Sequence, residues 1–452
     1  MSSSPAEASQ ELPARIEALV AERALAEASA LVAELHASDL ADLLERLDEG
    51  SQIALLSTLP VELASEALAE MEEGEERGHL LAALEPKKSA ELIEELADDD
   101  AVDLMGELEP PEQQKILEAL SEETADDLVD LMQYDEETAG GLMTTELVAV
   151  EGSLTAADAL IQVRHQGREV EDFYTVFVID ADRRLLGTLR LDDLVIADPD
   201  ESIETMVEEP VATVGPDEDQ EDVGRLIARY NLASIPVVTP AGVLLGRITF
   251  DDVIDVIEAE QTEDILRLAG VNDEDELKNS WKASVRTRLP WLALNLLTAS
   301  AAASVILVFE DVIEQVLTLA FLAPIIAAMG GSSGTQSLAI TIRRLTIEGP
   351  GSTRGFVMKE ILIGLVIGGV LGTGIAVLAL LVNGDPMLGL VVMLAMWGNQ
   401  IVAGFAGAFV PATLDRMGVD PSVASSVFVH TLTDLCGFFL LLGLASKLLL
   451  PG

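Results

Sequence analysis

Cysteine and basic residues are scarce in this chain of 452 residues. The single cysteine, Cys436, excludes a disulfide framework. Only 26 lysine and arginine residues stand against 79 aspartate and glutamate residues, which gives a net charge of −53. Such a surface repels nucleic acid and anionic lipid, so no nucleic-acid partner is expected. The N-terminus also lacks an apolar segment behind a basic start, so we expect no signal peptide and a cytoplasmic soluble part.

The acidic residues gather in the first part of the chain. Residues 1–284 hold 70 of the 79 acidic and 18 of the 26 basic residues, whereas residues 285–452 are nearly neutral and strongly apolar. An acidic soluble half therefore precedes a membrane half. Two explanations of the acidity stay open: adaptation to a salty cytosol, and sensing of the divalent cations that an acidic surface attracts.

Residues 1–133 are expected to form an acidic α-helical domain. Segments such as DLADLLERL and ETADDLVDLM place leucine or methionine at three- and four-residue steps, the spacing of amphipathic helices. Breaks are expected at Asp48–Gly50, at Pro60 and at Pro110–Pro111. Short helices with frequent breaks predict an α-superhelix, and a plain helical bundle is the alternative.

After Met143 the hydrophobic period changes, and one α/β unit occurs twice. Val176–Val195 and Ile235–Ile254 each read as strand, turn and strand, followed by a helix that paired aspartates open. Asp193 and Asp252 are placed to cap these helices. The duplicated unit resembles a tandem pair of CBS domains, which we assign to residues 134–206 and 207–260.

The second copy resembles the adenosine-nucleotide pattern of CBS domains more closely than the first. It has Gly246, Ile248, Thr249 and Asp252 in the usual order, whereas the first copy has Arg190 where serine or threonine is usual. If ATP binds, this resemblance implies that Thr249 and Asp252 contact it. A purely structural CBS pair is the alternative.

Residues 261–284 read as a helical connection, and residues 285–452 as an all-α membrane domain. The connection is either a continuous helix that transmits motion or a passive spacer. Five spans are expected, at Trp291–Phe309, Ile313–Ile342, Ile361–Val382, Leu388–Leu414 and Val423–Leu448. Most lysine and arginine residues precede the first span or follow the second and fourth, so we expect a multi-pass protein of the plasma membrane with a cytoplasmic N-terminus and an external C-terminus.

The last span carries one acidic residue, Asp434, with His430 one helical turn before it. A carboxylate at membrane depth costs several kcal/mol on cautious scales, so it is expected to face a partner, a water-filled path or an ion. A buried structural pair of His430 and Asp434 is the alternative. Before this span, Asp420 is expected to cap the helix with Pro421 at its first position, or to hold a cation at the cytoplasmic mouth.

Glycines mark two of the other spans. Gly330, Gly331 and Gly334 interrupt the second span, which predicts a loosened backbone whose carbonyl oxygens suit Mg²⁺ and its water shell. The third span places glycines at four-residue steps, which predicts a close helix-packing face at Gly364, Gly368 and Gly372.

From end to end the chain resembles the MgtE-type magnesium transporters. YDEETAGGLM at Tyr134–Met143 and TEDILRLAGV at Thr262–Val271 resemble the family's domain junctions. RLPWLALNLLTAS, MGGSSGTQS and DPSVASSVFVHTLTDLCG resemble its first, second and fifth spans. The resemblance implies a multi-domain membrane protein with an α-superhelical N-domain, an α/β CBS pair, a plug helix and five transmembrane helices.

The same resemblance implies a function and a set of sites. It implies a homodimer in which the two Asp434 side chains bind hydrated Mg²⁺ at a pore, with passive influx driven by the membrane potential. It also implies that cytosolic Mg²⁺ closes the pore by binding acidic residues of the N-domain, CBS pair and plug helix. In this sequence the matching regulatory residues are Asp251, Asp255, Glu258 and Glu260.

Some positions depart from the family pattern. Ser332 stands where asparagine is usual, Ser426 and Val427 replace a frequent Gly-Pro pair, and His430 replaces a small residue. The expected pore-metal residues are accordingly Asp434, Ser426, His430, Gly330 and Ser332. A histidine near Asp434 could narrow the path, add pH sensitivity or favour softer metals, so Co²⁺, Ni²⁺ and Mn²⁺ stand beside Mg²⁺ as expected ions.

Three functions are compatible with the sequence. The first is a Mg²⁺-selective channel gated by cytosolic Mg²⁺. The second is coupled exchange, in which His430 and Asp434 relay a proton or Na⁺. The third is a membrane-anchored sensor whose CBS pair binds a nucleotide. No nucleophile–base pair, catalytic metal motif or phosphate loop appears, so an enzyme is not expected.

Overall fold

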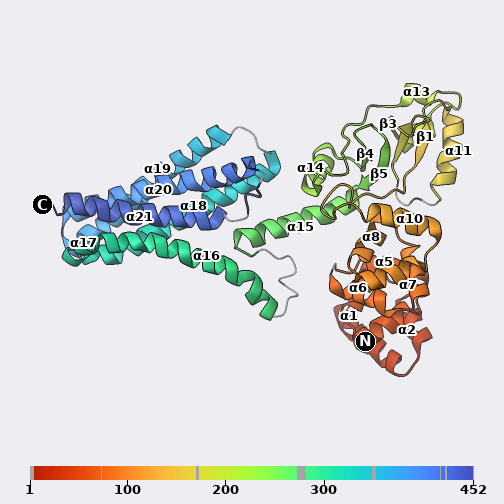
Figure 1. The fold of residues 1–452 in the computed structure, drawn as a ribbon, viewed down its shortest axis with the longest axis horizontal. Coiled ribbons are helices and arrows are strands. Elements are labelled where there is room, and N and C mark those ends of the chain that lie inside the picture. Colours follow the sequence, from red (N-terminus) through yellow and green to blue (C-terminus); the bar gives the residue numbers. More distant parts are fainter. Residues whose placement is uncertain are drawn as a thin grey trace. The chain divides into compact units, whose positions relative to one another are not determined.

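The computed structural model describes residues 5–72, 74–168, 170, 173–271, 281–348, 353–417, 419–422 and 425–450. Two compact units divide the chain, Met1–Ile257 and Glu258–Gly452 (Figure 1). The first unit contains a run of short helices followed by two small sheets, and the second contains long apolar helices.

Ten short helices open the first unit. They are α1 Pro5–Ala21, α2 Leu25–Val32, α3 Ala37–Leu44, α4 Glu49–Leu56, α5 Val61–Ala69, α6 Glu75–Ala83, α7 Pro86–Ile93, α8 Asp98–Gly106, α9 Pro110–Leu117 and α10 Glu122–Leu131. The expected breaks are confirmed: Asp48 caps α4 by accepting a hydrogen bond from the Ser51 N–H at 3.1 Å, Pro60 precedes α5, and Pro110 starts α9.

These helices pack as two interleaved rows. Helices α2, α4, α6, α8 and α10 pack one against the next, and so do α3, α5, α7 and α9. Each helix thus contacts the helix two places along the chain, the repeating arrangement of a superhelix. The superhelix is therefore confirmed over the plain bundle.

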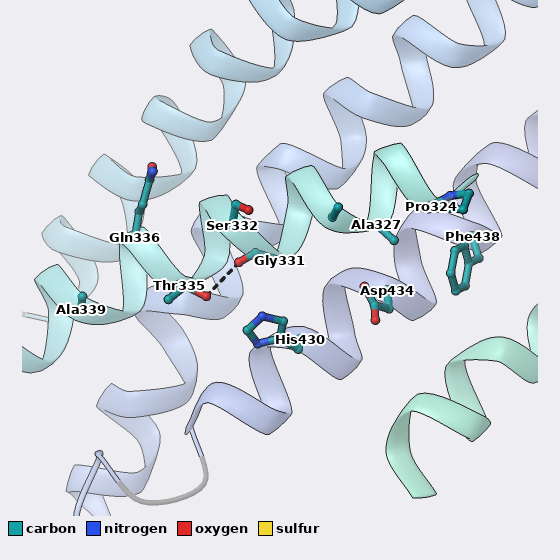
Figure 2. A pocket seen from close by; sticks show the side chains of 11 residues that line it. Pro324, Ala327, Gly331, Ser332, Thr335, Gln336, Ala339, His430, Asp434 and Phe438 are labelled. Carbon is teal, nitrogen blue, oxygen red and sulfur yellow. Dashed lines mark hydrogen bonds between the residues drawn. The ribbon is translucent and has the colours of Figure 1, made fainter. Parts of the chain in front are cut away.

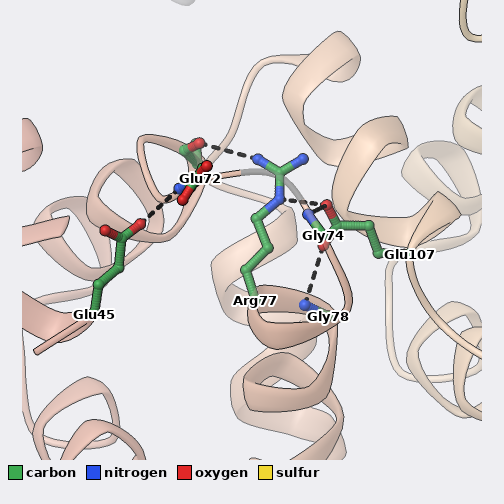
Figure 3. Close-up of polar contacts among 7 residues, drawn as sticks. Glu45, Glu72, Gly74, Arg77, Gly78 and Glu107 are labelled. Atoms are coloured by element: carbon green, nitrogen blue, oxygen red, sulfur yellow. Dashed lines mark hydrogen bonds and ion pairs between the residues drawn. The ribbon is translucent and has the colours of Figure 1, made fainter. Parts of the chain in front are cut away.

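A buried ion pair ties α6 to the end of α8. The Arg77 Nε lies 2.6 Å from a Glu107 carboxylate oxygen, and only 5% of Arg77 is exposed. Figure 3 shows that the same carboxylate accepts hydrogen bonds from the backbone N–H groups of Gly74, at 2.8 Å, and Gly78, at 3.1 Å. Because every oxygen of the pair is engaged, the charges are well compensated.

Two copies of one unit follow, as the sequence predicts. The first contains β1 Ala149–Glu151, α11 Ala156–Gln166, β2 Thr175–Ile179, β3 Leu185–Arg190, α12 Leu191–Ile196 and α13 Ile203–Met206. The second contains α14 Gln220–Tyr230, β4 Ser234–Val238, β5 Leu244–Thr249 and α15 Phe250–Leu268. Strands β2 and β3 pair antiparallel, as do β4 and β5, and each pairing has one register shift near its turn.

The segment before the first copy pairs with the second copy, and the segment before the second copy pairs with the first. Thr144 forms a bridge with Arg247 on β5, and Glu208 forms one with Thr188 on β3. Glycine is needed on both central strands: a Cβ on Gly187 would lie 2.3 Å from the Glu208 carbonyl oxygen, and one on Gly246 would lie 2.6 Å from that of Thr144. The two copies therefore form one interlocked pair.

The two expected helix caps have different outcomes. The Asp252 carboxylate accepts a hydrogen bond from the Thr249 N–H at 3.1 Å and caps α15, as predicted. Asp193 holds the equivalent position in the first turn of α12, three residues after Arg190, but no such cap hydrogen bond is found for it within the described ranges, so this cap is wrong. Arg190 instead forms an ion pair with Asp192 in the first turn.

The second unit contains six helices in its described ranges: α16 Trp281–Val308, α17 Glu310–Gln315, α18 Thr318–Glu348, α19 Thr353–Asn383, α20 Pro386–Arg416 and α21 Ser425–Leu448. Five of them are long and apolar enough to cross a membrane, as the sequence predicts; α17 is the short exception. Helix α20 packs on α18, α19 and α21 and forms the centre of the domain.

The predicted break of the second span at its glycines is wrong. Helix α18 runs without interruption from Thr318 to Glu348, so its glycine carbonyls stay within the helix. The glycines instead allow neighbouring helices to approach: a Cβ on Gly330 would lie 2.2 Å from Asn399 Nδ2, and one on Gly334 would lie 2.6 Å from Val429 Cγ1. The close-packing face of the third span is confirmed, since a Cβ on Gly364 would lie 2.3 Å from the Gln400 carbonyl oxygen.

Two further predictions about helix ends are wrong. Helix α21 begins at Ser425, so Asp420 does not cap it and Pro421 is not its first residue. The connection is not one helix running into the first span, because α15 ends where Gly270 adopts a φ of +80° and the Val271 N–H bonds the Leu266 carbonyl at 2.9 Å. Residues 272–280 of the expected plug segment lie outside the described residues.

Candidate functional site

A cavity of about 750 Å³ opens between α18 and α21 (Figure 2). We call it the α18–α21 cavity. Its lining residues are Pro324, Ala327, Ala328, Gly331, Ser332, Thr335, Gln336, Ala339, His430, Asp434 and Phe438. Small and hydroxyl-bearing side chains make up most of the α18 wall, and the carboxylate of Asp434 and the imidazole of His430 come from α21.

Only some of the expected pore-metal residues meet in this cavity. Asp434, His430 and Ser332 line it, and they come from two helices far apart in the sequence. Gly330 instead packs on Asn399, and Ser426 offers its backbone carbonyl to His430 from outside the lining. Gly331, from the same glycine run as Gly330, does line the cavity, and so does Gln336, which the sequence analysis did not single out.

The His430 ring has a defined orientation. Its Nδ1 lies 2.8 Å from the Ser426 carbonyl oxygen, and a carbonyl only accepts, so Nδ1 carries the proton in the neutral ring. A Cβ on Gly331 would lie 3.1 Å from His430 Cδ2 and 3.4 Å from Nε2. The glycine therefore leaves the space that the ring edge occupies.

Two buried amides on α20 fix the helix that forms the cavity wall. Asn399 Nδ2 donates to the Ile326 carbonyl at 2.9 Å, and Gln400 Nε2 donates to the Met329 carbonyl at 3.0 Å. Asn399 also lies against the last helix, because a Cβ on Gly437 would be 2.9 Å from its Nδ2. The sequence analysis missed these residues; two adjacent carboxamides in an apolar span were the available signal.

A second candidate site lies in the first unit, where α8 meets the start of α15. Burial, with repulsion from Asp252, raises the pKa of Asp99 well above its usual value and that of Asp100 to about 6. Burial also raises the pKa of Asp252, although its hydrogen bond from Thr249 opposes the rise. Asp99 Oδ1 is buried and accepts no hydrogen bond from the described residues. The buried Arg247 opposes the rise at Asp252 and supplies positive charge near Asp99, but the carboxylates still outnumber it, so negative charge remains costly here.

The expected regulatory residues divide between two faces of α15. At 100° per residue, Asp251, Asp255 and Glu258 share one face, whereas Glu260 points to the opposite side. No group of three or more histidine, cysteine, aspartate or glutamate side chains within the described ranges converges closely enough to hold a metal ion.

Asp420 has a defined partner within the second unit. Its carboxylate forms an ion pair with Arg267, near the end of α15, and accepts hydrogen bonds from the N–H and hydroxyl of Ser422. Arg267 also pairs with Glu263 one turn earlier. The loop between α20 and α21 is therefore fastened to the end of α15 by charge.

Family models match most of the chain. A model described as a divalent cation transporter matches residues 323–444, the MgtE intracellular N domain matches residues 35–137, and the CBS domain matches residues 139–200 and 201–259. The magnesium transporter MgtE of Thermus thermophilus is 37% identical over 327 residues, 71% of this chain and 72% of that one. The magnesium transporter MgtE of Enterococcus faecalis is 36% identical over 319 residues, 70% of each chain. The chain belongs to the MgtE family.

Two solved structures of soluble parts of magnesium transport proteins resemble this chain over somewhat more than half of its length. The crystal structure of the soluble part of a magnesium transporter matches with a TM-score of 0.51 and 32% identity, over 56% of this chain and 99% of that one. The cytosolic domain of the Mg²⁺ channel MgtE in complex with ATP matches with a TM-score of 0.50 and 34% identity, over 52% of this chain and 97% of that one. The MgtE assignment therefore extends from the soluble part to the membrane helices.

In this MgtE chain, the two expected nucleotide residues contact each other. Both the N–H and the hydroxyl of Thr249 donate to the Asp252 carboxylate. Asp252 also faces the acidic residues of α8, which raise the cost of further negative charge. A nucleotide that uses Asp252 has to share it with this hydrogen bond.

Proposed function

We propose that this multi-pass membrane protein transports Mg²⁺ through the membrane domain, along a path that includes the α18–α21 cavity. One observation carries the proposal: the Asp434 carboxylate lies in a cavity whose other wall consists of small and hydroxyl-bearing residues. A carboxylate at membrane depth is retained where it serves an ion path. Mg²⁺ loses its water reluctantly, and a cavity of about 750 Å³ has room for the hydrated ion.

A homodimer completes this proposal. The cavity belongs to one chain, and a second copy facing it would supply another Asp434 and double the negative charge around the ion. We place the N-terminus in the cytoplasm and the C-terminus outside, because most lysine and arginine residues flank the spans on one side. The proposed domain limits are 1–133, 134–206, 207–260, 261–284 and 285–452.

Feedback by cytosolic Mg²⁺ is the proposed mode of regulation. The acidic residues of α8 and α15 repel one another, and a hydrated Mg²⁺ among them would offset that repulsion. Loss of the ion would let these surfaces separate. In the second unit, the Arg267–Asp420 ion pair supplies a contact through which α15 holds the loop before α21.

Two further kinds of ligand belong to the proposal, a nucleotide and other divalent cations. A related cytosolic domain was crystallised in complex with ATP, and Thr249 and Asp252 are the residues we expect at an equivalent site here. Co²⁺, Ni²⁺ and Mn²⁺ carry the same charge as Mg²⁺ and are expected to reach the same cavity. A catalytic role is not proposed, because the relatives are named as transporters.

Coupled transport is the second candidate function. The observation that favours it is the position of His430, one turn from Asp434 in the same cavity, where the two groups could exchange a proton. A channel needs only the electrochemical gradient of Mg²⁺, whereas coupled transport also needs a gradient of protons or Na⁺.

A flux assay on the reconstituted full chain tests both candidates. Vesicles loaded with a Mg²⁺-sensitive dye are expected to show uptake that follows the membrane potential alone. Asp434→Ala is expected to abolish this uptake, and Asp311→Ala, which removes an exposed carboxylate on α17, is expected to leave it unchanged. Uptake that requires a proton or Na⁺ gradient would instead establish coupled transport, and uptake that persists in Asp434→Ala would contradict the proposed path.

A further inference from the structure

The imidazole in the α18–α21 cavity presents a free nitrogen lone pair. Because the Ser426 carbonyl holds the proton on Nδ1, the unprotonated nitrogen of neutral His430 is Nε2. This is the arrangement by which proteins orient metal-binding histidines: a backbone carbonyl fixes one nitrogen, and the other faces the metal. His430 contributes to the cavity lining, and the Cδ2–Nε2 edge of its ring faces Gly331 on α18, which lines the same cavity.

A carboxylate lies within reach of the same ion. Asp434 follows His430 by four residues on α21, and side chains at this spacing have Cβ atoms about 5–6 Å apart on one helix face. Both line the cavity. One helix therefore carries a nitrogen and an oxygen ligand on the same face, both at the lining of one cavity.

This pair of ligands distinguishes between metals. Mg²⁺ takes oxygen ligands and retains water, so imidazole adds little to its binding. Ni²⁺, Co²⁺ and Zn²⁺ bind imidazole nitrogen directly, and their affinity for such sites is higher. We propose that His430 Nε2 and Asp434 form an inner-sphere site for borderline divalent transition ions, and that an ion held there obstructs the passage of Mg²⁺. The obstruction rests on the proposed transport function, whereas the binding does not.

Gly331 makes the site possible on the opposing wall. A Cβ at this position would lie 3.1 Å from His430 Cδ2 and 3.4 Å from Nε2, so it would press on the ring edge that carries the ligand nitrogen. Gly331→Ala is therefore expected to weaken binding without removing either ligand. This gives a second variant that tests the geometry rather than the presence of the histidine.

Binding is tested with Ni²⁺ on the full-length protein in lipid nanodiscs. X-ray absorption at the nickel edge is expected to show imidazole scattering in the wild-type protein and to lose it in His430→Ala. His165→Ala, at an exposed position on α11, is the matched control and is expected to keep it. Imidazole scattering that persists in His430→Ala would overturn the site.

Obstruction is tested by adding Ni²⁺ outside vesicles that take up Mg²⁺. The half-blocking Ni²⁺ concentration is expected to rise at least tenfold in His430→Ala, since loss of a group that merely orients a ligand already costs about 10–100-fold in affinity. Equal half-blocking concentrations in wild type and His430→Ala, each measured relative to its own Mg²⁺ uptake without Ni²⁺, would overturn the obstruction alone. Absence of Mg²⁺ uptake with His430-dependent Ni²⁺ binding would refute the transport function and leave the site standing.

Discussion

Removing one charge from the acidic contact between α8 and α15 is expected to stabilise the soluble part. Burial and the charge of Asp252 raise the pKa of Asp100 from its usual 3.8 to about 6. One pKa unit corresponds to about 1.4 kcal/mol, so ionised Asp100 destabilises the folded state by at most about 3 kcal/mol at pH 7. Asp100 is only partly removed from water, which screens its charge, so we expect Asp100→Asn to raise the free energy of unfolding by about 1–2 kcal/mol.

The sign of the pH dependence follows from the raised pKa. Below pH 3.8 Asp100 is protonated in both states and costs nothing. Between pH 3.8 and about 6 the unfolded chain loses its proton while the folded chain retains it, so the folded state becomes less stable as pH rises. The advantage of Asp100→Asn is therefore expected to be full above pH 6 and to vanish towards pH 4.

Urea unfolding of a fragment of residues 1–260 provides the assay. The first unit is compact by itself, and the soluble part of a related transporter has been crystallised alone. Mg²⁺ that binds the folded acidic contact should stabilise the wild-type fragment and stabilise Asp100→Asn less, because the variant has lost one charge. Asp42→Asn on α3 makes the same change at an exposed site and should shift stability by no more than about 0.5 kcal/mol.

Two results would refute this reasoning. One is an Asp100→Asn fragment less stable than wild type at pH 7. The other is a stability difference of the same size at pH 4 and pH 7. Either would mean that Asp100 contributes a favourable interaction rather than repulsion at this contact.

Three further predictions concern other contacts. Arg77→Met is expected to lower the free energy of unfolding of the same fragment by about 3–5 kcal/mol, because it leaves the charge of Glu107 buried without its partner. Lys87→Met removes one partner of an exposed ion pair and should change the free energy of unfolding by under about 1 kcal/mol. Equal effects of the two substitutions would contradict this prediction. Gly330→Ala is expected to destabilise the membrane domain by about 1–3 kcal/mol in detergent melts, whereas Gly374→Ala, with nothing within 4 Å, should be tolerated. Arg267→Ala is expected to leave Mg²⁺ uptake less sensitive to internal Mg²⁺, and unchanged inhibition would rule out the Arg267–Asp420 contact in gating.

Much of the fold could be predicted because it depends on local pattern. The short helices, the duplicated strand–turn–strand–helix unit and the five apolar helices each repeat a signal that a single stretch of sequence carries. Asp434 and His430 stood out for the same reason, since a charged or titratable group is rare in an apolar span. That Asp434 and His430 line one cavity with Ser332 depends on how α18 and α21 pack, and the hydrophobic pattern of the sequence does not specify this packing.

Other features depend on contacts between distant segments. Gly330 and Gly334 were predicted to break the helix. In a sequence, a glycine that loosens a helix cannot be told from one that lets a neighbouring helix approach. The contacts of Gly330 with Asn399 and of Gly334 with Val429 show the second role here. Asp99 and Asp252 approach each other across 153 residues of sequence. The stop of α15 at Gly270 was a missed local signal, since glycine after a helix commonly adopts a positive φ.

A recording of current through the reconstituted full chain tests whether Mg²⁺ crosses the membrane along the α18–α21 cavity. With Mg²⁺ as the permeant cation, we expect a current that reverses at the Mg²⁺ equilibrium potential, declines as Mg²⁺ rises on the cytoplasmic side and disappears in Asp434→Ala. Asp311→Ala should leave it intact. A wild-type current that survives in Asp434→Ala, or Mg²⁺ uptake without any such current, would contradict a Mg²⁺-conducting path at the α18–α21 cavity.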